Sequence, residues 1–502
     1  MSRSRGLITA TLLTVSVIPK PATATDASAY ASSEIQLYSV PNPYGTRELR
    51  RRRYTQTLGL TVADLLDREA ATGPAVTFSS RLRLDSDLGQ PSALRDPTRA
   101  DEFVPGMSLA PVDVQYAFFD VRRLGGEALS VRLGRQYLVD PLGWWSFDGA
   151  QLRIDTPARI ALSAFAGAEQ RDGVPLLATS RFTADGVFRG SRRDLEVNQW
   201  PSYLDARRLA PAFGFGAASH ELRWLDAEIV YRRVEERDAA FVTIFPETPG
   251  ALGVMTSRRV ATERLAGALR LSREELGELA GRLAYDFVVG RVREHAASLS
   301  WFVGDPVTLS VGYDYSLPSF DGDSIFNWFS TSAVTTAEVA ATLRARPHLS
   351  LSPRVGLRAY GAPGSGSGET GPAVTEADAP RTEAAASDAF GSLAVVRHWA
   401  AGSVTFDAGG DGGPDGHRVG TGAEVEQTFR DGFYDTIAGL SLHEWHDDQQ
   451  PARDATSLSY VVGGGVHPAS GSRLGVEWEH TTNRLVGQRF RCLFTLRLEV
   501  GR

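Results

Sequence analysis

The sequence predicts an all-β fold, a transmembrane antiparallel β-barrel of about 18 strands (range 18–20) in the outer membrane of a Gram-negative bacterium. Three observations lead to this prediction: a leader typical of exported proteins, alternation of apolar and polar residues with period two, and connections that alternate between short and long. Of the 502 residues, 42% are hydrophobic, and the mean hydropathy is −0.18. No run approaches the roughly 18–20 consecutive apolar residues that a transmembrane helix needs.

The N-terminal residues 1–24 are predicted to be a cleavable signal peptide. Arg3 and Arg5 form a positive n-region, residues 7–18 an apolar stretch, and residues 22–24 (Ala-Thr-Ala) a small-x-small cleavage site. The apolar stretch is too short to span a bilayer, so it is not an anchor. Because Cys492 is the single cysteine, no internal disulfide can stabilise the exported chain.

Period-two alternation is the main evidence for strands. In residues 76–85, Val76, Phe78 and Leu82 share one face, and Arg81 and Arg83 share the other. Because successive side chains of a strand point to opposite faces, such a segment has one apolar and one polar surface. The same pattern recurs at residues 129–134, 279–289, 307–315, 354–358, 473–479 and 490–500.

The connections distinguish a membrane barrel from a soluble β-sandwich or a β-propeller. Tight turns are predicted at residues 124–127, 304–306, 346–348, 430–432 and 468–472, and long loops near 87–112, 168–211, 235–257, 317–332 and 360–388. Short periplasmic turns and long external loops are typical of outer-membrane barrels. A propeller would instead repeat every 40 to 50 residues or so, and no such repeat is visible.

Three parts are expected along the chain. Residues 1–24 are the signal peptide, residues 25–53 a polar periplasmic tail or lumen segment, and residues 54–502 the barrel, with a low-complexity surface loop at 362–388. A disordered segment is the alternative for residues 25–53. Residues 258–283 also fit helical spacing and residues 389–409 alternate weakly, which widens the range of strand number.

The polar faces of the predicted strands carry many arginines, which should line the lumen. The chain has 53 Lys+Arg and 60 Asp+Glu residues, and this net charge of −7 argues against nucleic-acid binding. The arginines could form an excess that favours anionic sugars, or they could pair with carboxylates across strands as structural ladders. The candidate lumen or substrate-path residues are Arg81, Arg83, Arg132, Arg153, Arg282, Arg354, Arg358, Arg491 and Arg497.

One predicted hairpin carries the most distinctive local sequence. Gly134-Arg135-Gln136 is followed, after Trp144 and Trp145, by Phe147-Asp148-Gly149. Glycine fits where strands crowd, and tryptophan favours a membrane interface. The two motifs, spanning about 16 residues, resemble those of the alginate-export porins and related exopolysaccharide-export barrels. That resemblance implies an outer-membrane barrel that conducts a polysaccharide through an arginine-rich lumen.

We therefore expect a porin for export of a secreted polysaccharide, with a general or small-solute diffusion porin as the alternative and an adhesin-like barrel as a third possibility. The expected partners are outer-membrane lipids, the secreted polysaccharide, a periplasmic polysaccharide-export protein and the barrel-assembly machinery. No catalytic motif, cofactor-binding motif or nucleic-acid partner is predicted. His443 and His446 lie near carboxylates, but on a strand they point to opposite faces, so no metal site is expected.

Overall fold

The computed structural model is a barrel of β-strands. It describes residues 26–41, 48–65, 73–87, 112–126, 128–170, 210–244, 252–304, 306–317, 333–361, 386–414, 416–448, 450–485 and 487–501. The predicted signal peptide and most of the predicted surface loop at 362–388 lie outside these ranges. Within them, no helix is long and apolar enough to cross a membrane.

The described residues form 22 strands and one 3-10 helix, η8 (Pro451–Arg453). In chain order the strands are β1 (Ala27–Pro41), β2 (Glu48–Val62), β3 (Ala75–Asp87), β4 (Val112–Leu124), β5 (Leu129–Asp140), β6 (Gly143–Asp155), β7 (Ile160–Glu169), β8 (Pro211–Ser219), β9 (Leu225–Ile244), β10 (Leu252–Arg273), β11 (Gly277–Asp286), β12 (Arg291–Phe302), β13 (Val307–Ser316), β14 (Val334–Arg346), β15 (Leu349–Tyr360), β16 (Ser387–Trp399), β17 (Gly402–Gly413), β18 (Gly416–Phe429), β19 (Tyr434–Asp447), β20 (Ala455–Val466), β21 (Ser472–Asn483) and β22 (Gly487–Gly501).

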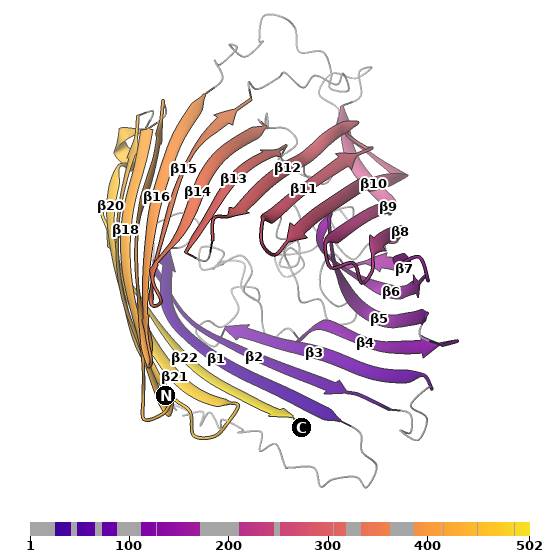
Figure 1. Cartoon of the computed structure of the whole chain (residues 1–502), viewed down its shortest axis with the longest axis horizontal. Helices are drawn as coiled ribbons and strands as arrows, with labels where there is room; N and C mark the ends of the chain where they lie inside the picture. Colours follow the sequence, from indigo (N-terminus) through magenta and orange to yellow (C-terminus); the bar gives the residue numbers. More distant parts are fainter. Residues whose placement is uncertain are drawn as a thin grey trace, which may run out of the picture.

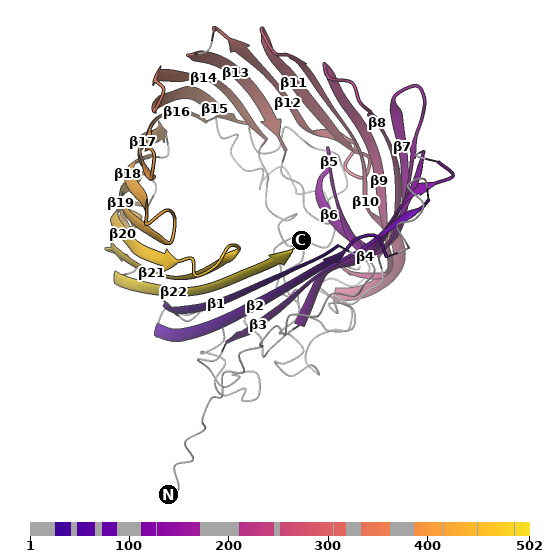
Figure 2. The same cartoon turned by 60° about the horizontal axis from the view of Figure 1, so that its bottom comes forward.

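The sheet closes on itself. Each strand pairs antiparallel with the next strand in the sequence, and β1 pairs with β22 in a register that runs from Ser28↔Gly501 to Tyr38↔Arg491. Figures 1 and 2 show the resulting ring of strands. Closure gives every strand a paired neighbour on both sides, so that backbone polar groups are satisfied within the sheet, as a sheet that spans a membrane requires. The predicted antiparallel barrel is confirmed, but the strand number of 18–20 is wrong, because the barrel has 22 strands.

One mispredicted segment accounts for part of this difference, and a second changes the length of two strands. Residues 25–53, predicted to be a tail or lumen segment, instead contribute β1 and the first part of β2 to the wall. Residues 235–257, predicted to be a loop, mostly extend the long strands β9 and β10, which pair as far as Leu252↔Ile244. Strand pairing depends on backbone hydrogen bonds, so polar segments without strong alternation still form strands beside an established neighbour. Residues 258–283 likewise form no helix but parts of β10 and β11 joined by a turn at 274–276.

The two ends of the barrel differ as the sequence predicts. The start of β1, the end of β22 and the short connections 125–128, 347–348, 400–401 and 430–433 lie at one end. The connections between β3 and β4, β7 and β8, β13 and β14, and β15 and β16 are long, and all belong to the other end. We call these the turn end and the loop end. In outer-membrane barrels the turn end faces the periplasm.

The outward face of the wall is apolar over its middle and aromatic at both margins. Large apolar side chains such as Leu58, Val311 and Leu357 are exposed there. Exposed aromatic residues lie outward near both ends: Trp224, Trp301 and Trp399 toward the turn end, and Phe213, Phe287 and Phe490 toward the loop end. An apolar band between two aromatic girdles matches the profile of a bilayer.

Candidate functional site: the lumen wall and an inward hairpin

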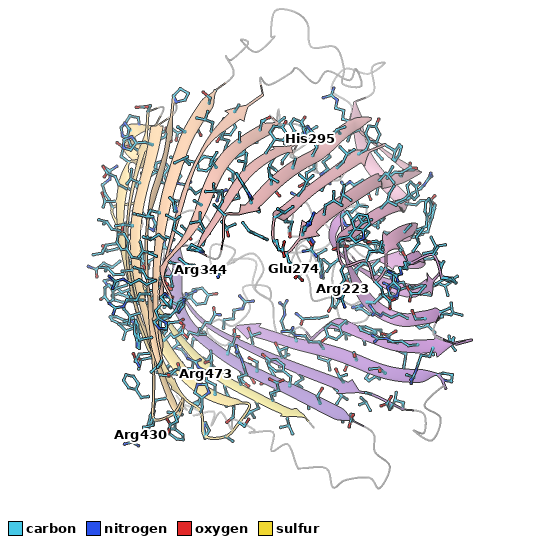
Figure 3. The ribbon with its side chains drawn as sticks, in the orientation of Figure 1. Arg223, Glu274, His295, Arg344, Arg430 and Arg473 are labelled. Carbon is cyan, nitrogen blue, oxygen red and sulfur yellow. The ribbon has the colours of Figure 1, made fainter. Side chains whose placement is uncertain are left out.

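The inward face of the wall is polar and carries the arginines that the sequence singled out. The strand register places all nine candidates on this face, for example Arg81 beside Gly59 and Arg497 beside Ser32. Side chains from every part of the ring are drawn in Figure 3. The sequence therefore predicted their orientation correctly, while their role in a substrate path stays a prediction.

Most of these arginines bind carboxylates on the same or a nearby strand. Arg354 Nε donates to Glu338 at 2.9 Å, and Arg491 lies 2.5 Å from Glu479. The remaining ion pairs of the candidate arginines are Arg132–Asp120 at 3.4 Å, Arg153–Asp155 at 3.0 Å, Arg282–Asp314 at 3.6 Å and Arg282–Glu294. Except for Arg153–Asp155, which joins two residues of β6, these pairs cross between strands and are the ladders that the sequence left open as an alternative to an arginine excess.

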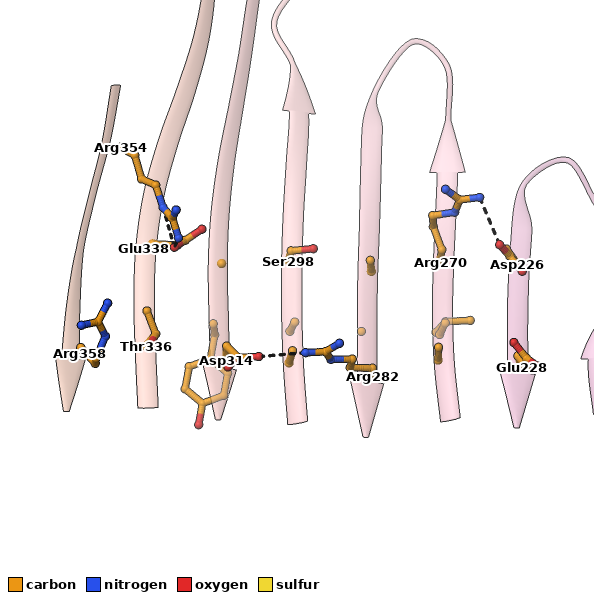
Figure 4. A pocket seen from close by; sticks show the side chains of 18 of the residues that line it. Asp226, Glu228, Arg270, Arg282, Ser298, Asp314, Thr336, Glu338, Arg354 and Arg358 are labelled. Carbon is orange, nitrogen blue, oxygen red and sulfur yellow. Dashed lines mark hydrogen bonds and ion pairs between the residues drawn. The ribbon is translucent and has the colours of Figure 1, made fainter. Parts of the chain in front are cut away.

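A broad pocket across β9–β16 shows this charge balance directly (Figure 4). We call it the ladder pocket. Four carboxylates and four arginines line it, and three ion pairs cross its floor, including Arg270–Asp226 at 3.2 Å. The charged lining residues are Asp226, Glu228, Arg270, Arg282, Asp314, Glu338, Arg354 and Arg358. In this sector positive and negative charges cancel.

The hairpin β5–β6 departs from the wall. Pairing of β4 with β5 ends at Ala117↔Arg135, and pairing of β6 with β7 ends at Phe147↔Glu169, so beyond these residues β5 and β6 form strand pairs only with each other. Figure 2 shows this hairpin inside the ring of strands. The bend is at Gly134, whose φ of +125° suits glycine and where a Cβ would lie 2.3 Å from the Ala117 carbonyl oxygen.

One face of the hairpin packs against the inner wall. The Phe147 ring is fully buried, stacks on Trp145 at 4.6 Å and lies 5.6 Å from Phe165 of β7. Val234 of β9 belongs to the same cluster. Small inward residues on β8 make room for these rings, since a Cβ at Gly214 would lie 2.3 Å from the Phe165 ring. The prediction of an interfacial position is wrong for Trp145, which is buried inside the barrel.

The tip of the hairpin is held by β9. Arg232 NH2 donates to the Leu142 carbonyl oxygen at 3.5 Å, and its guanidinium lies 3.7 Å from the Asp140 carboxylate and 4.9 Å from the Trp145 ring centroid. Because β9 is the third strand along from β6, the hairpin must cross the inner faces of β7 and β8 to make these contacts. It therefore narrows the lumen.

The two motifs of the hairpin lie directly opposite one another. The register pairs Gly134 with Gly149, Arg135 with Asp148, and Gln136 with Phe147. Arg135 binds Asp148 through two hydrogen bonds of 2.6 Å, and Gln136 Nε2 donates to the Gly149 carbonyl oxygen at 3.1 Å. The six residues thus form the bend and the base of the inward hairpin.

The histidine-rich end of β19 does not gather metal ligands. His446 contacts Asp454 at 2.8 Å and Asp448 at 3.0 Å, whereas His443 is paired with Gly420 on the inward face. No group of three or more potential ligands was found among the described residues.

Comparisons with known proteins give structural likeness without sequence support. No protein-family model matches the chain, and no curated protein does either. Similar solved structures include OccAB4 of Acinetobacter baumannii (8% identity, TM-score 0.43, covering 95% of this chain and 98% of that one) and a BenF-like porin from Pseudomonas fluorescens Pf-5 (8%, 0.42, 95% and 99%). The translocation pore of the P pilus usher PapC is similar at 8% identity and a TM-score of 0.41, covering 94% and 99%. These likenesses do not confirm the resemblance to alginate-export porins.

Proposed function

We propose that this chain is an outer-membrane channel through which small hydrophilic solutes diffuse. The observation that carries the proposal is the solvated, charged inward face of a closed barrel. Arg282 and Arg354 point into the barrel and form ion pairs, yet their side chains are 51% and 50% exposed. Charges removed from water cost several kcal/mol each, roughly, unless they are fully paired, so the lumen beside them is water-filled.

The charge balance of the wall favours weakly selective diffusion. On the inward face of the described strands, carboxylates are about as numerous as arginines, as the ladder pocket illustrates. A channel of this kind offers many weak contacts and no deep electrostatic well. Small solutes of either charge can then pass, which is the behaviour of a diffusion porin.

Two of the observations that motivated polysaccharide export, the first expectation from the sequence, have another explanation. The Gly-Arg-Gln and Phe-Asp-Gly residues have a structural explanation in the base of the inward hairpin. The arginine-rich lumen is matched by carboxylates. The small-solute alternative therefore becomes the proposal, and a polymer substrate with a periplasmic export partner has no separate support in the geometry.

Liposome swelling tests the proposal. Purified, folded protein in liposomes should admit a pentose rapidly and a trisaccharide more slowly, while protein-free liposomes admit neither. Absence of swelling with every sugar would contradict the diffusion channel. Loss of surface polysaccharide in a deletion strain, with repeat-unit synthesis intact, would favour the export function instead.

A further inference from the structure

Two arginines lie on the outward face at the turn end of the neighbouring strands β14, β15 and β16 (Figure 1). Leu349 of β15 pairs with Arg346 of β14 on one side and with Arg397 of β16 on the other. Residues that pair directly point to the same side of a sheet, and Leu349 shares the outward face with Val355 and Leu357 at even spacing. We call Arg346, Leu349 and Arg397 the arginine row.

A β-bulge gives Arg346 its outward direction. Arg344 and Arg346 are two residues apart and would share a face on a regular strand. The β14–β15 register shifts between them, so that Arg344 pairs with Ser350 and Arg346 with Leu349, the adjacent residue of β15. Adjacent residues point to opposite faces, so Arg344 lies inward and Arg346 outward. A bulge often re-aims one side chain in this way.

The arginine row lies at the aromatic margin of the apolar band. Trp399 follows Arg397 by two residues on the same outward face of β16 and is 38% exposed. Its indole N–H donates to the Gln427 side-chain oxygen at 2.7 Å. Tryptophan favours the interface between hydrocarbon and headgroups. Long arginine side chains beside it can extend their guanidinium groups to the phosphates of that interface.

The positive charge of this region has no counterpart nearby. Both outward arginines are exposed, and neither has an ion pair within the part of the chain that the structure describes, unlike Arg354 of the lumen. Residues 339–352 and 394–405, which contain the arginine row, include no Asp or Glu. The flanking turns 303–306 and 430–433 add one arginine and two aspartates, which leaves four arginines and two aspartates at this sector of the turn end.

We propose that the arginine row binds the headgroup of an anionic phospholipid in the leaflet at the turn end, such as phosphatidylglycerol. Arg346 and Arg397 are two strands apart, about 10 Å between backbones, so both guanidinium groups can reach one phosphate. Each offers paired N–H donors, which suit phosphate oxygens. An acyl chain then follows Leu349 onto the apolar band. A phospholipid matches both the cations and this band, whereas a soluble acidic protein matches the cations alone.

Native mass spectrometry of the folded full-length barrel in detergent tests the proposal. The probes are phosphatidylglycerol and phosphatidylcholine with the same acyl chains, supplied together at equal concentration. We expect the first bound lipid to be phosphatidylglycerol in clear preference. Equal binding of the two lipids would overturn the proposal. Displacement of phosphatidylglycerol by an equal concentration of glycerol 1-phosphate would also overturn it, because the site would then bind any phosphate.

Variants locate the binding. Arg346→Gln and Arg397→Gln should each weaken phosphatidylglycerol binding by about fivefold, the factor that corresponds to about 1 kcal/mol for one arginine at an anionic surface, and leave phosphatidylcholine binding unchanged. The double variant should lose the preference. Arg344→Gln is the matched control, since it removes the same charge from the same turn on the inward face. An equal loss in the control would overturn the proposal, as would unchanged binding in the double variant.

The test does not depend on what crosses the lumen. The heat-dependent gel migration typical of folded barrels verifies that each variant is folded, and either single variant suffices if the other does not fold. Intact liposome swelling without a preference for phosphatidylglycerol overturns only the lipid site. A preference for phosphatidylglycerol without swelling overturns the diffusion channel and supports the lipid site.

Discussion

Replacing Phe147 with alanine tests the docking of the inward hairpin. The ring is fully buried between Trp145 and Phe165, so its removal leaves a cavity that the rigid wall of β7–β9 cannot fill. Buried Phe→Ala changes cost about 3–5 kcal/mol. The pairings of β5 with β4 and of β6 with β7, on the turn-end side of Gly134, are unaffected. The substitution therefore destabilises the docked state of the hairpin and not the wall. The undocked population should rise by about a hundredfold or more.

Hydrogen exchange measures this effect. Backbone amides of residues 137–145 should exchange at least about a hundredfold faster in the Phe147→Ala barrel, if local opening governs their exchange. Phe406→Ala is the matched control, because the Phe406 ring lies on the outward face of β17, and it should leave these amides unchanged. Unchanged exchange in folded Phe147→Ala protein would refute the view that this ring fixes the hairpin to the wall.

Three further predictions concern the bend, the lumen charge and a loop-end carboxylate. Gly134→Ala should lower the denaturant midpoint of the folded barrel far more than Gly126→Ala. Both glycines have a positive φ, which costs alanine about 1–3 kcal/mol, but only at Gly134 would the added Cβ lie 2.3 Å from a carbonyl oxygen. Equal shifts of the denaturant midpoint in the two variants would contradict this steric explanation. Arg354→Gln leaves Glu338 without its ion partner and should move the reversal potential toward cation selectivity, whereas Arg354→Lys should preserve it. Hydrogen bonding from the Asp447 backbone N–H, and then from His446, holds the pKa of Asp454 below its ordinary value. The pKa of Asp454 is lower in the folded than in the unfolded protein. The stabilising interaction is therefore complete above the ordinary carboxyl pKa of about 4 and is lost as the pH falls through the pKa of the folded state. Exchange of the Asp447 amide should therefore be protected at neutral pH relative to Asp454→Asn and lose that protection in acid; protection that is the same in both proteins would contradict it.

Local alternation predicted most of the wall and the orientation of its side chains. The segment 76–85 forms most of β3, and Phe490 and Arg491 fall on opposite faces of β22 as expected. Orientation follows from one strand alone, because the side-chain period is two. The carboxylate partner of each arginine cannot be predicted from one strand. Arg354, for example, contacts Glu338 only because of the register of β14 with β15.

The inward hairpin could not be predicted from its own sequence. Its position depends on contacts between Phe147, Phe165 and Val234, which the fold brings together from three strands. A partial signal is present in β8, where Ala212 and Gly214 alternate with Phe213 and Phe215. Small residues on an inward face indicate that something packs against it, but they do not identify what.

Single-channel recording in planar bilayers tests the central claim most directly. The closed barrel with a solvated, charge-balanced inward face predicts steady current that is roughly proportional to voltage, with a reversal potential near zero in a salt gradient. Folded protein that inserts into the bilayer and passes no current would contradict the account.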